Sequence, residues 1–135
     1  MLSLRILVVD DHHLARAMIK TALRFCRCAE PEIVGEAADG ATAIEMARQL
    51  APDVITMDIS LPDANGLEVT RKLTEGTPQF EVVVVTMHGE PRYRAAALKA
   101  GAVFFIDKMF LIEELPGYLD RLARQRAVCG AAEGS

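Results

Sequence analysis

The chain has 135 residues, of which 51% are hydrophobic and 25% are charged, as is usual for a single globular domain with its own core. Its formal net charge of −4 disfavours nonspecific nucleic-acid binding, which needs a basic surface. No apolar run approaches the roughly 20 residues of a membrane span, and residues 1–9 lack the pattern of a signal peptide. We therefore expect a cytoplasmic protein that does not associate with membranes.

Apolar runs alternate with amphipathic stretches along the chain, which predicts alternating strands and helices. The predicted strands are residues 4–9, 33–35, 54–57, 80–86 and 103–106. The predicted helices are residues 13–25, 43–50, 67–73, 95–98 and a last one that starts at Leu115 or Pro116 and ends near Ala127. We start the last helix there because a proline inside a helix would break it, whereas a proline at the first position costs little.

The first predicted helix and the segment after it carry two further expectations. The helix has apolar residues near helical spacing, which we expect to face the core: Leu14, Ala17, Met18, Ala22, Leu23 and Phe25. Pro31 should interrupt the chain before the second strand. Cys26 and Cys28 lack a second ligand pair at metal-binding spacing, so we expect reduced thiols near the helix end.

The unbroken valine run at residues 82–85 indicates a sheet that is covered on both faces. Strand followed by helix, five times over, predicts an α/β fold. We expect a doubly wound (βα)5 unit with a five-stranded parallel sheet, helices on both faces and right-handed crossovers. We take the strand order as 2-1-3-4-5, the flavodoxin-like order. One domain would cover residues 1–129, and a disordered tail would follow at residues 130–135.

Four of the predicted strands end on polar groups. The first ends on Asp10 and Asp11, the third on Asp58, the fourth on Thr86 and the fifth on Lys108. The carboxyl ends of parallel strands meet at one edge of a sheet, and neighbouring strands lie about 4.8 Å apart. The sequence therefore predicts one pocket that holds three carboxylates, a hydroxyl and an ammonium group.

This set of groups suits phosphoryl chemistry. Three close carboxylates repel one another, and a hard divalent cation such as Mg²⁺ would relieve the repulsion. An ionised carboxylate such as Asp58 can attack phosphorus and form an acyl phosphate. Thr86 and Lys108 would stabilise negative charge on the phosphoryl oxygens.

The sequence resembles the receiver domain of two-component response regulators. Five segments carry the resemblance, at residues 6–12, 52–58, 61–68, 82–86 and 100–108. The resemblance implies that Asp58 is the phosphoryl acceptor. It also implies that Asp10, Asp11 and Asp58, with the Ser60 backbone carbonyl, hold Mg²⁺, or Mn²⁺ in its place.

The resemblance also implies a switch. Thr86 would move toward the phosphoryl group, Lys108 would pair with it, and the rotamer of Phe105 would follow Thr86. Ser60, Met87 and His88 stand at positions that would tune phosphorylation and dephosphorylation. His12 and His13 are adjacent at a helix start and should point in different directions, so we expect no transition-metal site.

The resemblance implies protein partners rather than direct nucleic-acid binding. A sensor histidine kinase or a histidine phosphotransfer protein would donate the phosphoryl group. A downstream protein would read the surface formed by the fourth helix, the fifth strand and the fifth helix, and a homodimer could use it too. The domain would be a phosphoacceptor switch with intrinsic phosphotransfer and autodephosphorylation chemistry only, rather than an enzyme.

Three alternatives stay open. The chain could be a receiver fragment of a DNA-binding response regulator, although residues 104–108 and the Pro116 helix start favour a stand-alone receiver. A phosphatase with an aspartyl-phosphate intermediate would carry a second acid where Ser60 stands. A flavin carrier of similar fold would need a phosphate-binding loop rich in Ser, Thr and Gly where residues 10–13 lie.

Overall fold

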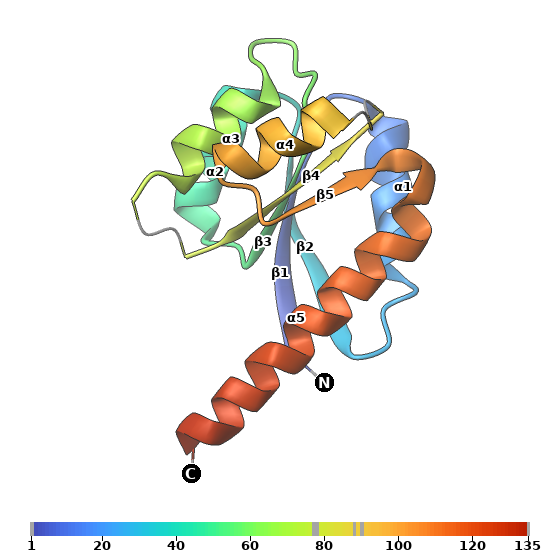
Figure 1. Cartoon of the computed structure of the whole chain (residues 1–135), viewed down its shortest axis with the longest axis vertical. Helices are drawn as coiled ribbons and strands as arrows, with labels where there is room; N and C mark the ends of the chain where they lie inside the picture. The colour runs from blue at the N-terminus through green and yellow to red at the C-terminus, as the bar shows by residue number, and fades with distance from the viewer. Residues whose placement is uncertain (1, 77–78, 88, 90, 135) are drawn as a thin grey trace.

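The computed structural model describes residues 2–76, 79–87, 89 and 91–134. Strands and helices alternate along the chain (Figure 1). The elements are β1 (Leu2–Val9), α1 (His13–Leu23), β2 (Ala29–Ala37), α2 (Gly40–Leu50), β3 (Val54–Met57), α3 (Gly66–Thr74), β4 (Glu81–Thr86), α4 (Pro91–Ala100), β5 (Phe104–Asp107), the 3-10 turn η1 (Lys108–Phe110) and α5 (Leu111–Gly134). Among the described residues, no helix is long and apolar enough to cross a membrane.

The five strands form one parallel sheet in the order β2-β1-β3-β4-β5, so the predicted fold class is confirmed. Helices α1 and α5 cover one face, and α2, α3 and α4 cover the other (Figure 1). Successive side chains of a strand point to opposite faces. Accordingly, Ile6 and Val8 pack toward α1 and α5, whereas Leu7 and Val9 pack toward α2 and α3. Both faces of the sheet are therefore core, as the valine run indicated.

The predicted inner face of α1 is confirmed at Ala22 and Leu23 and wrong at the other positions. Leu14 is 70% exposed, and Met18 and Phe25 are also exposed, whereas Ala15 and Ile19 are buried. The helix has two apolar stripes, and the stripe with the smaller side chains packs against the sheet and α5. Arg16 sets this rotation, because its guanidinium donates a 2.6 Å hydrogen bond to the Asp10 carbonyl and forms an ion pair with Glu36 on β2.

The second strand is longer than predicted. It begins at Ala29 and contains Pro31, which we expected to lie before the strand. Strand β2 lies at the edge of the sheet, where a proline removes no hydrogen bond on the open side. Cys26 and Cys28, which precede it, are half-buried free thiols, as predicted.

The last helix also differs from the prediction at both ends. It begins at Leu111, so Pro116 lies inside it, and it continues to Gly134 through most of the tail that we expected to be disordered. Four leucines at helical spacing are buried on its inner face: Leu111, Leu115, Leu119 and Leu122. Each contributes about 1.5–3 kcal/mol, which together exceeds the roughly 3 kcal/mol cost of an interior proline. Alanines at residues 131 and 132 favour the extension, since Ala is the best helix former.

Candidate functional site

Two of the acidic residues are held in place by the sheet itself. The Asp10 N–H donates to the Ala37 carbonyl, and the Asp58 N–H donates to the Val9 carbonyl, both at 3.0 Å. Backbone pairing thus continues one residue beyond β1 and β3. The Asp10 side chain is 1% exposed and Asp58 is 5% exposed, so both carboxylates are buried side by side at the carboxyl edge.

Lys108 joins the two carboxylates. It follows β5 in the turn η1, and Asp107 caps that turn by accepting from the Met109 N–H at 2.9 Å. The Lys108 Nζ lies 2.9 Å from Asp10 Oδ2 and 3.7 Å from Asp58 Oδ2. The ammonium group, itself 8% exposed, compensates the negative charge that the two buried carboxylates place together.

A cavity of about 260 Å³ opens above Asp58. Its lining comes from four strand ends: His12, Asp58, Ser60, Thr86, Met87 and Lys108. Thr86 is fully buried at the end of β4, whereas Met87 is 72% exposed at the mouth. The predicted tuning residue His88 lies outside the described residues. The cavity is large enough for a phosphoryl group, whose size is that of a few water molecules.

The loop after Asp58 folds back closely over it. The Gly66 N–H donates to the Ile59 carbonyl at 2.6 Å, and Asn65 caps α3 by accepting from the Leu67 N–H. A Cβ atom at Gly66 would lie 1.9 Å from the Asp58 carbonyl oxygen. Glycine is therefore required at this position, because any larger residue would push the loop away from the site.

Competing effects act on the ionisation of Asp58. Burial raises the pKa of Asp58, the Lys108 ammonium lowers it, and the Asp10 carboxylate raises it again; the N–H groups of Ile59 and Ser60 lower it slightly. The net effect is a pKa above the ordinary value of 3.8. Lys108 is thus the main partner that favours the ionised, nucleophilic form.

The acidic residues fit a divalent cation. Carboxylate oxygens of Asp10, Asp11 and Asp58 and a ring nitrogen of His12 all lie within 4.8 Å of one another. Asp11 Oδ1 is buried and accepts no hydrogen bond from any described residue. A cation would complete its coordination, and hard oxygen ligands are those that Mg²⁺ takes. The role of the Ser60 carbonyl stays a prediction.

Phe105 lies away from the cavity, in the core. It is 1% exposed and packs with Ile59, Val84 and Ala97 beneath α4. The guanidinium of Arg94 lies 5.2 Å from its ring centroid. This contact could not be predicted from the sequence, because Arg94 is one of several basic residues on α4 and its distance to Phe105 depends on how α4 docks.

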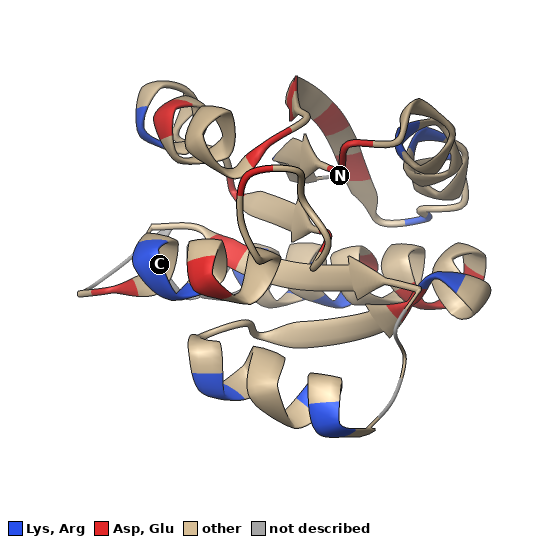
Figure 2. Ribbon diagram, turned by 90° about the horizontal axis from the view of Figure 1, so that it is seen from above, with Lys and Arg blue, Asp and Glu red and all other residues tan. Residues whose placement is uncertain are grey.

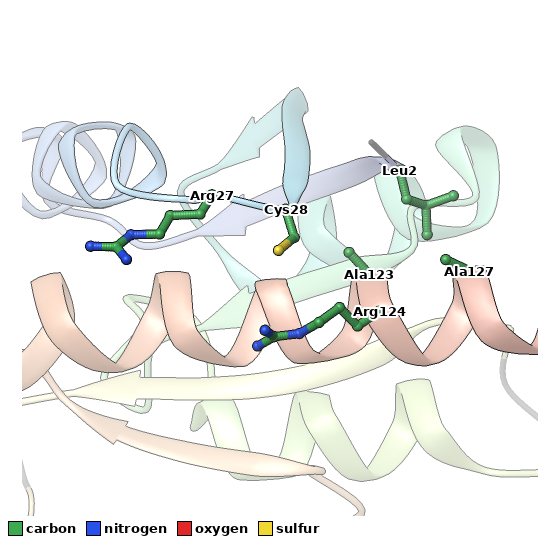
Figure 3. A pocket seen from close by; sticks show the side chains of 6 residues that line it. All are labelled: Leu2, Arg27, Cys28, Ala123, Arg124 and Ala127. Carbon is green, nitrogen blue, oxygen red and sulfur yellow. The ribbon is translucent and has the colours of Figure 1, made fainter.

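A second cavity, of about 380 Å³, lies at the opposite edge of the sheet (Figure 3). Arg27, Cys28 and Arg124 line it together with apolar side chains. Nearby, burial and the Asp120 carboxylate raise the pKa of the Cys26 thiol to about 11. That edge therefore carries an unreactive thiol, and the chemistry of the molecule is concentrated at the carboxyl edge.

Comparison with known proteins identifies relatives of this arrangement. The chain matches the response regulator receiver domain family over residues 6–120. It is 38% identical over 112 residues to the response regulator GacA of Pseudomonas aeruginosa, an alignment that covers 83% of this chain and 51% of GacA. The chain thus spans about half the length of the curated relatives it matches.

Solved structures agree. A two-component response regulator of the LuxR family from Aurantimonas sp. superposes with a TM-score of 0.81 at 28% identity, over 91% of this chain and 86% of that one. The signal receiver domain of the putative response regulator NarL from Mycobacterium tuberculosis superposes with a TM-score of 0.74 at 29% identity, over the whole of both chains.

Proposed function

The chain belongs to the response regulator receiver domain family, and on that premise we propose that Asp58 accepts a phosphoryl group from a histidine kinase or a histidine phosphotransfer protein. One observation carries the proposal: Asp58 is the carboxylate that lines the cavity together with Thr86 and Lys108. Asp10 is held by Lys108 at 2.9 Å, and Asp11 is not among the residues that line the cavity. Asp58 is thus the acid with space beside it for an incoming phosphorus.

The reaction is a transfer between two nucleophiles. A carboxylate oxygen of Asp58 attacks the phosphorus, the bond from phosphorus to the donor nitrogen breaks, and the donor imidazole leaves with the electron pair. Lys108 Nζ, 3.7 Å from Asp58 Oδ2, is placed to pair with a phosphoryl oxygen. In this proposal the Thr86 hydroxyl, at the next strand end, donates to another.

A divalent cation, when bound, would neutralise charge on the phosphoryl oxygens. Asp10 and Asp11, with Asp58 and the Ser60 carbonyl, would hold it, and we propose Mg²⁺ with Mn²⁺ as a substitute. The protein residues then bind and orient the phosphoryl group, and the product is an acyl phosphate on Asp58. The domain is a phosphoacceptor switch in this proposal, and its own hydrolysis of the acyl phosphate resets it.

The output would pass through the α4 side of the molecule. Movement of the Thr86 hydroxyl toward the phosphoryl group would change the space next to Phe105 and so shift α4, β5 and α5 between two states. Helix α4 carries Arg92, Arg94 and Lys99 and no acidic residue between Pro91 and Ala100 (Figure 2). We propose this basic face as the surface for a downstream protein or a second copy of the chain.

The rates of phosphorylation and dephosphorylation of Asp58 would depend on the residues around the opening of the cavity. Met87, which is 72% exposed, and Ser60 both line the cavity. Both residues should alter the access of phosphodonors and water to Asp58. We propose the same role for His88 from its position in the sequence.

The whole protein has two candidate arrangements. Residues 104–108 favour a stand-alone receiver. The length of relatives such as the transcriptional regulatory protein DegU, of which the chain covers 44%, favours a receiver joined to a DNA-binding domain. The reading frame that follows Ser135 in the gene distinguishes the two.

The test of the phosphoacceptor is direct. The protein is incubated with radiolabelled acetyl phosphate and Mg²⁺, and acid-labile label on the protein is measured. Asp58→Asn should remove the label, because an amide cannot form the acyl phosphate. Asp63→Asn, a change in the nearby loop whose carboxylate caps α2, should keep it. Equal labelling of Asp58→Asn and the parent would refute the assignment.

A further inference from the structure

We propose that His12 supplies a nitrogen ligand to the carboxylate site, so that this receiver favours transition-metal ions such as Ni²⁺ and Co²⁺ over Mg²⁺ more strongly than its carboxylates alone would. This inference rests on the proposed function in one respect, that the acidic site binds a cation. It goes beyond that function by assigning a metal selectivity to one residue. The sequence alone predicted that the two adjacent histidines would not form such a site.

The backbone fixes where the His12 ring can reach. His12 is the N-cap residue of α1, with an extended conformation at φ −99° and ψ 118°. Its N–H donates to Asp10 Oδ1 at 3.0 Å, which ties the residue to the acidic pair. The ring then turns back over the site, and its Nδ1 lies 2.9 Å from Asp11 Oδ1 and 3.6 Å from Asp10 Oδ1.

The short contact to Asp11 has the spacing of two ligands on one ion. Asp11 Oδ1 is buried and accepts no hydrogen bond from the described part of the chain, so its 2.9 Å separation from His12 Nδ1 is an ion-pair contact without hydrogen-bond geometry. Adjacent ligands of an octahedral ion with bonds of about 2.1 Å stand about 3.0 Å apart. The ring nitrogen and the orphaned oxygen are therefore already at ligand spacing.

The remaining donors need only a small adjustment. Opposite ligands on such an ion lie about 4.2 Å apart, and the nitrogen and the carboxylate oxygens all lie within 4.8 Å of one another. A contraction of a few tenths of an ångström brings them onto one centre. The His12 side chain is 70% exposed, so it can make this adjustment without disturbing the core.

The ligand type decides the selectivity. Mg²⁺ takes oxygen ligands and keeps much of its water, so an imidazole adds little to its binding. Imidazole nitrogen is a good ligand for Ni²⁺, Co²⁺ and Zn²⁺, whose affinities for mixed nitrogen and oxygen sites exceed that of Mn²⁺. Removal of the ring should therefore weaken the binding of these ions and leave Mg²⁺ binding largely unchanged.

His13 provides a matched control. It is the neighbouring histidine, is exposed at the first position of α1, and is absent from the described group of potential ligands. Ni²⁺ and Mg²⁺ binding to the parent, His12→Gln and His13→Gln would be measured by titration calorimetry on the full chain. Co²⁺ absorption spectra would report separately on nitrogen coordination.

We expect His12→Gln to lower Ni²⁺ affinity by about tenfold or more, to change Mg²⁺ affinity by less than about threefold, and to alter the Co²⁺ spectrum. His13→Gln should change none of these. Equal losses for Ni²⁺ and Mg²⁺ would mean that His12 only orients Asp11, and unchanged Ni²⁺ affinity would mean that the ring is not a ligand; either result overturns the proposal. A parent that binds neither ion would refute the metal site as well, whereas the labelling of Asp58 tests the phosphoacceptor independently.

Discussion

Two buried carboxylates at opposite edges of the sheet have pKa values shifted in opposite directions. Asp58, at the carboxyl edge, is 5% exposed, and Asp120, at the amino edge, is 8% exposed. Burial has the largest effect on Asp58 and raises its pKa; the Lys108 ammonium lowers the pKa by less, and the nearby Asp10 carboxylate raises it further. Burial also acts to raise the pKa of Asp120, but N–H groups of Ala29, Arg27 and Cys28 outweigh it, and the pKa falls below 3.8.

The two carboxylates differ in their partners. Asp120 on α5 accepts backbone hydrogen bonds of 2.8–3.0 Å from three successive residues, Arg27 to Ala29, that lead into β2, so its charge joins α5 to the segment that begins β2. Asp58 lies beside other carboxylates at the edge of a cavity. A carboxylate that is satisfied within the fold stabilises it, whereas one that is left beside like charges is available to a cation or a phosphoryl group.

Asp120→Asn should cause the largest change in the free energy of unfolding. The substitution removes the charge and turns an amide N–H₂ or a weaker acceptor toward three N–H donors, so the free energy of unfolding should fall by about 3 kcal/mol. Urea unfolding followed by circular dichroism measures this. Glu113→Gln, an exposed acid on the same helix, should change stability by less than about 0.5 kcal/mol. A loss no larger than that of the control would show that Asp120 does not join the two elements.

A smaller loss of stability should follow from substitution of Gly66, which packs against the backbone of Asp58. Gly66→Ala places a Cβ 1.9 Å from the Asp58 carbonyl oxygen, so the loop must move, and stability should fall by about 2 kcal/mol. Gly117→Ala on α5, where an added Cβ meets nothing within 4 Å, should instead stabilise by up to about 1 kcal/mol. Thermal unfolding of both variants tests whether the backbone of Asp58 is tightly packed. Equal stability of Gly66→Ala and the parent would contradict that packing.

Asp58→Asn should stabilise the protein, whereas Asp120→Asn and Gly66→Ala should destabilise it. It removes a charge that burial and Asp10 disfavour, so the folded state should gain about 1 kcal/mol, or a few degrees in Tm, at neutral pH without added metal. Asp63→Asn is the matched change, because N–H groups of Gly40 and Ala41 lower the pKa of Asp63 and its removal should not stabilise the protein. Destabilisation by Asp58→Asn would show that Lys108 outweighs the repulsion from Asp10.

The carboxyl edge was predictable because it depends on chain order alone. Strand ends meet in a parallel sheet, so the sequence positions of Asp10, Asp58, Thr86 and Lys108 already implied that they lie together at one edge. What the sequence could not give depends on the rotation and docking of helices. Leu14 and Ile19 are both apolar residues of α1, and the contacts of Arg16 together with packing against α5 decide which is buried.

The position of His12 was missed for a related reason. Its direction follows from the extended N-cap conformation and the hydrogen bond to Asp10, neither of which residue types reveal. Asp120 was also missed, because its donors are backbone groups about ninety residues away in the chain and have no sequence signature. In each case the missing information was a direction in space and not a residue type.

The smallest expected effect is a change with pH in the stability differences of the two variants, Asp58→Asn and Asp120→Asn. It tests the comparison of the two carboxylates most directly. The pKa of Asp120 is lower in the folded state than in the unfolded chain, so its stabilisation is present above the unfolded value of 3.8 and is lost as pH falls through the folded value. The pKa of Asp58 is higher in the folded state, so the penalty for its charge is present above that value and disappears as pH falls to below 3.8. Relative to the parent at each pH, Asp120→Asn should have a lower free energy of unfolding and Asp58→Asn a higher one. Both differences should shrink toward zero between about pH 7 and pH 3. The Asp58 difference should shrink first, at the higher pH, because its folded pKa is the higher of the two. Urea unfolding of the three proteins across this range measures both differences, and the reverse order would mean that the surroundings of the two carboxylates do not differ as the structure indicates.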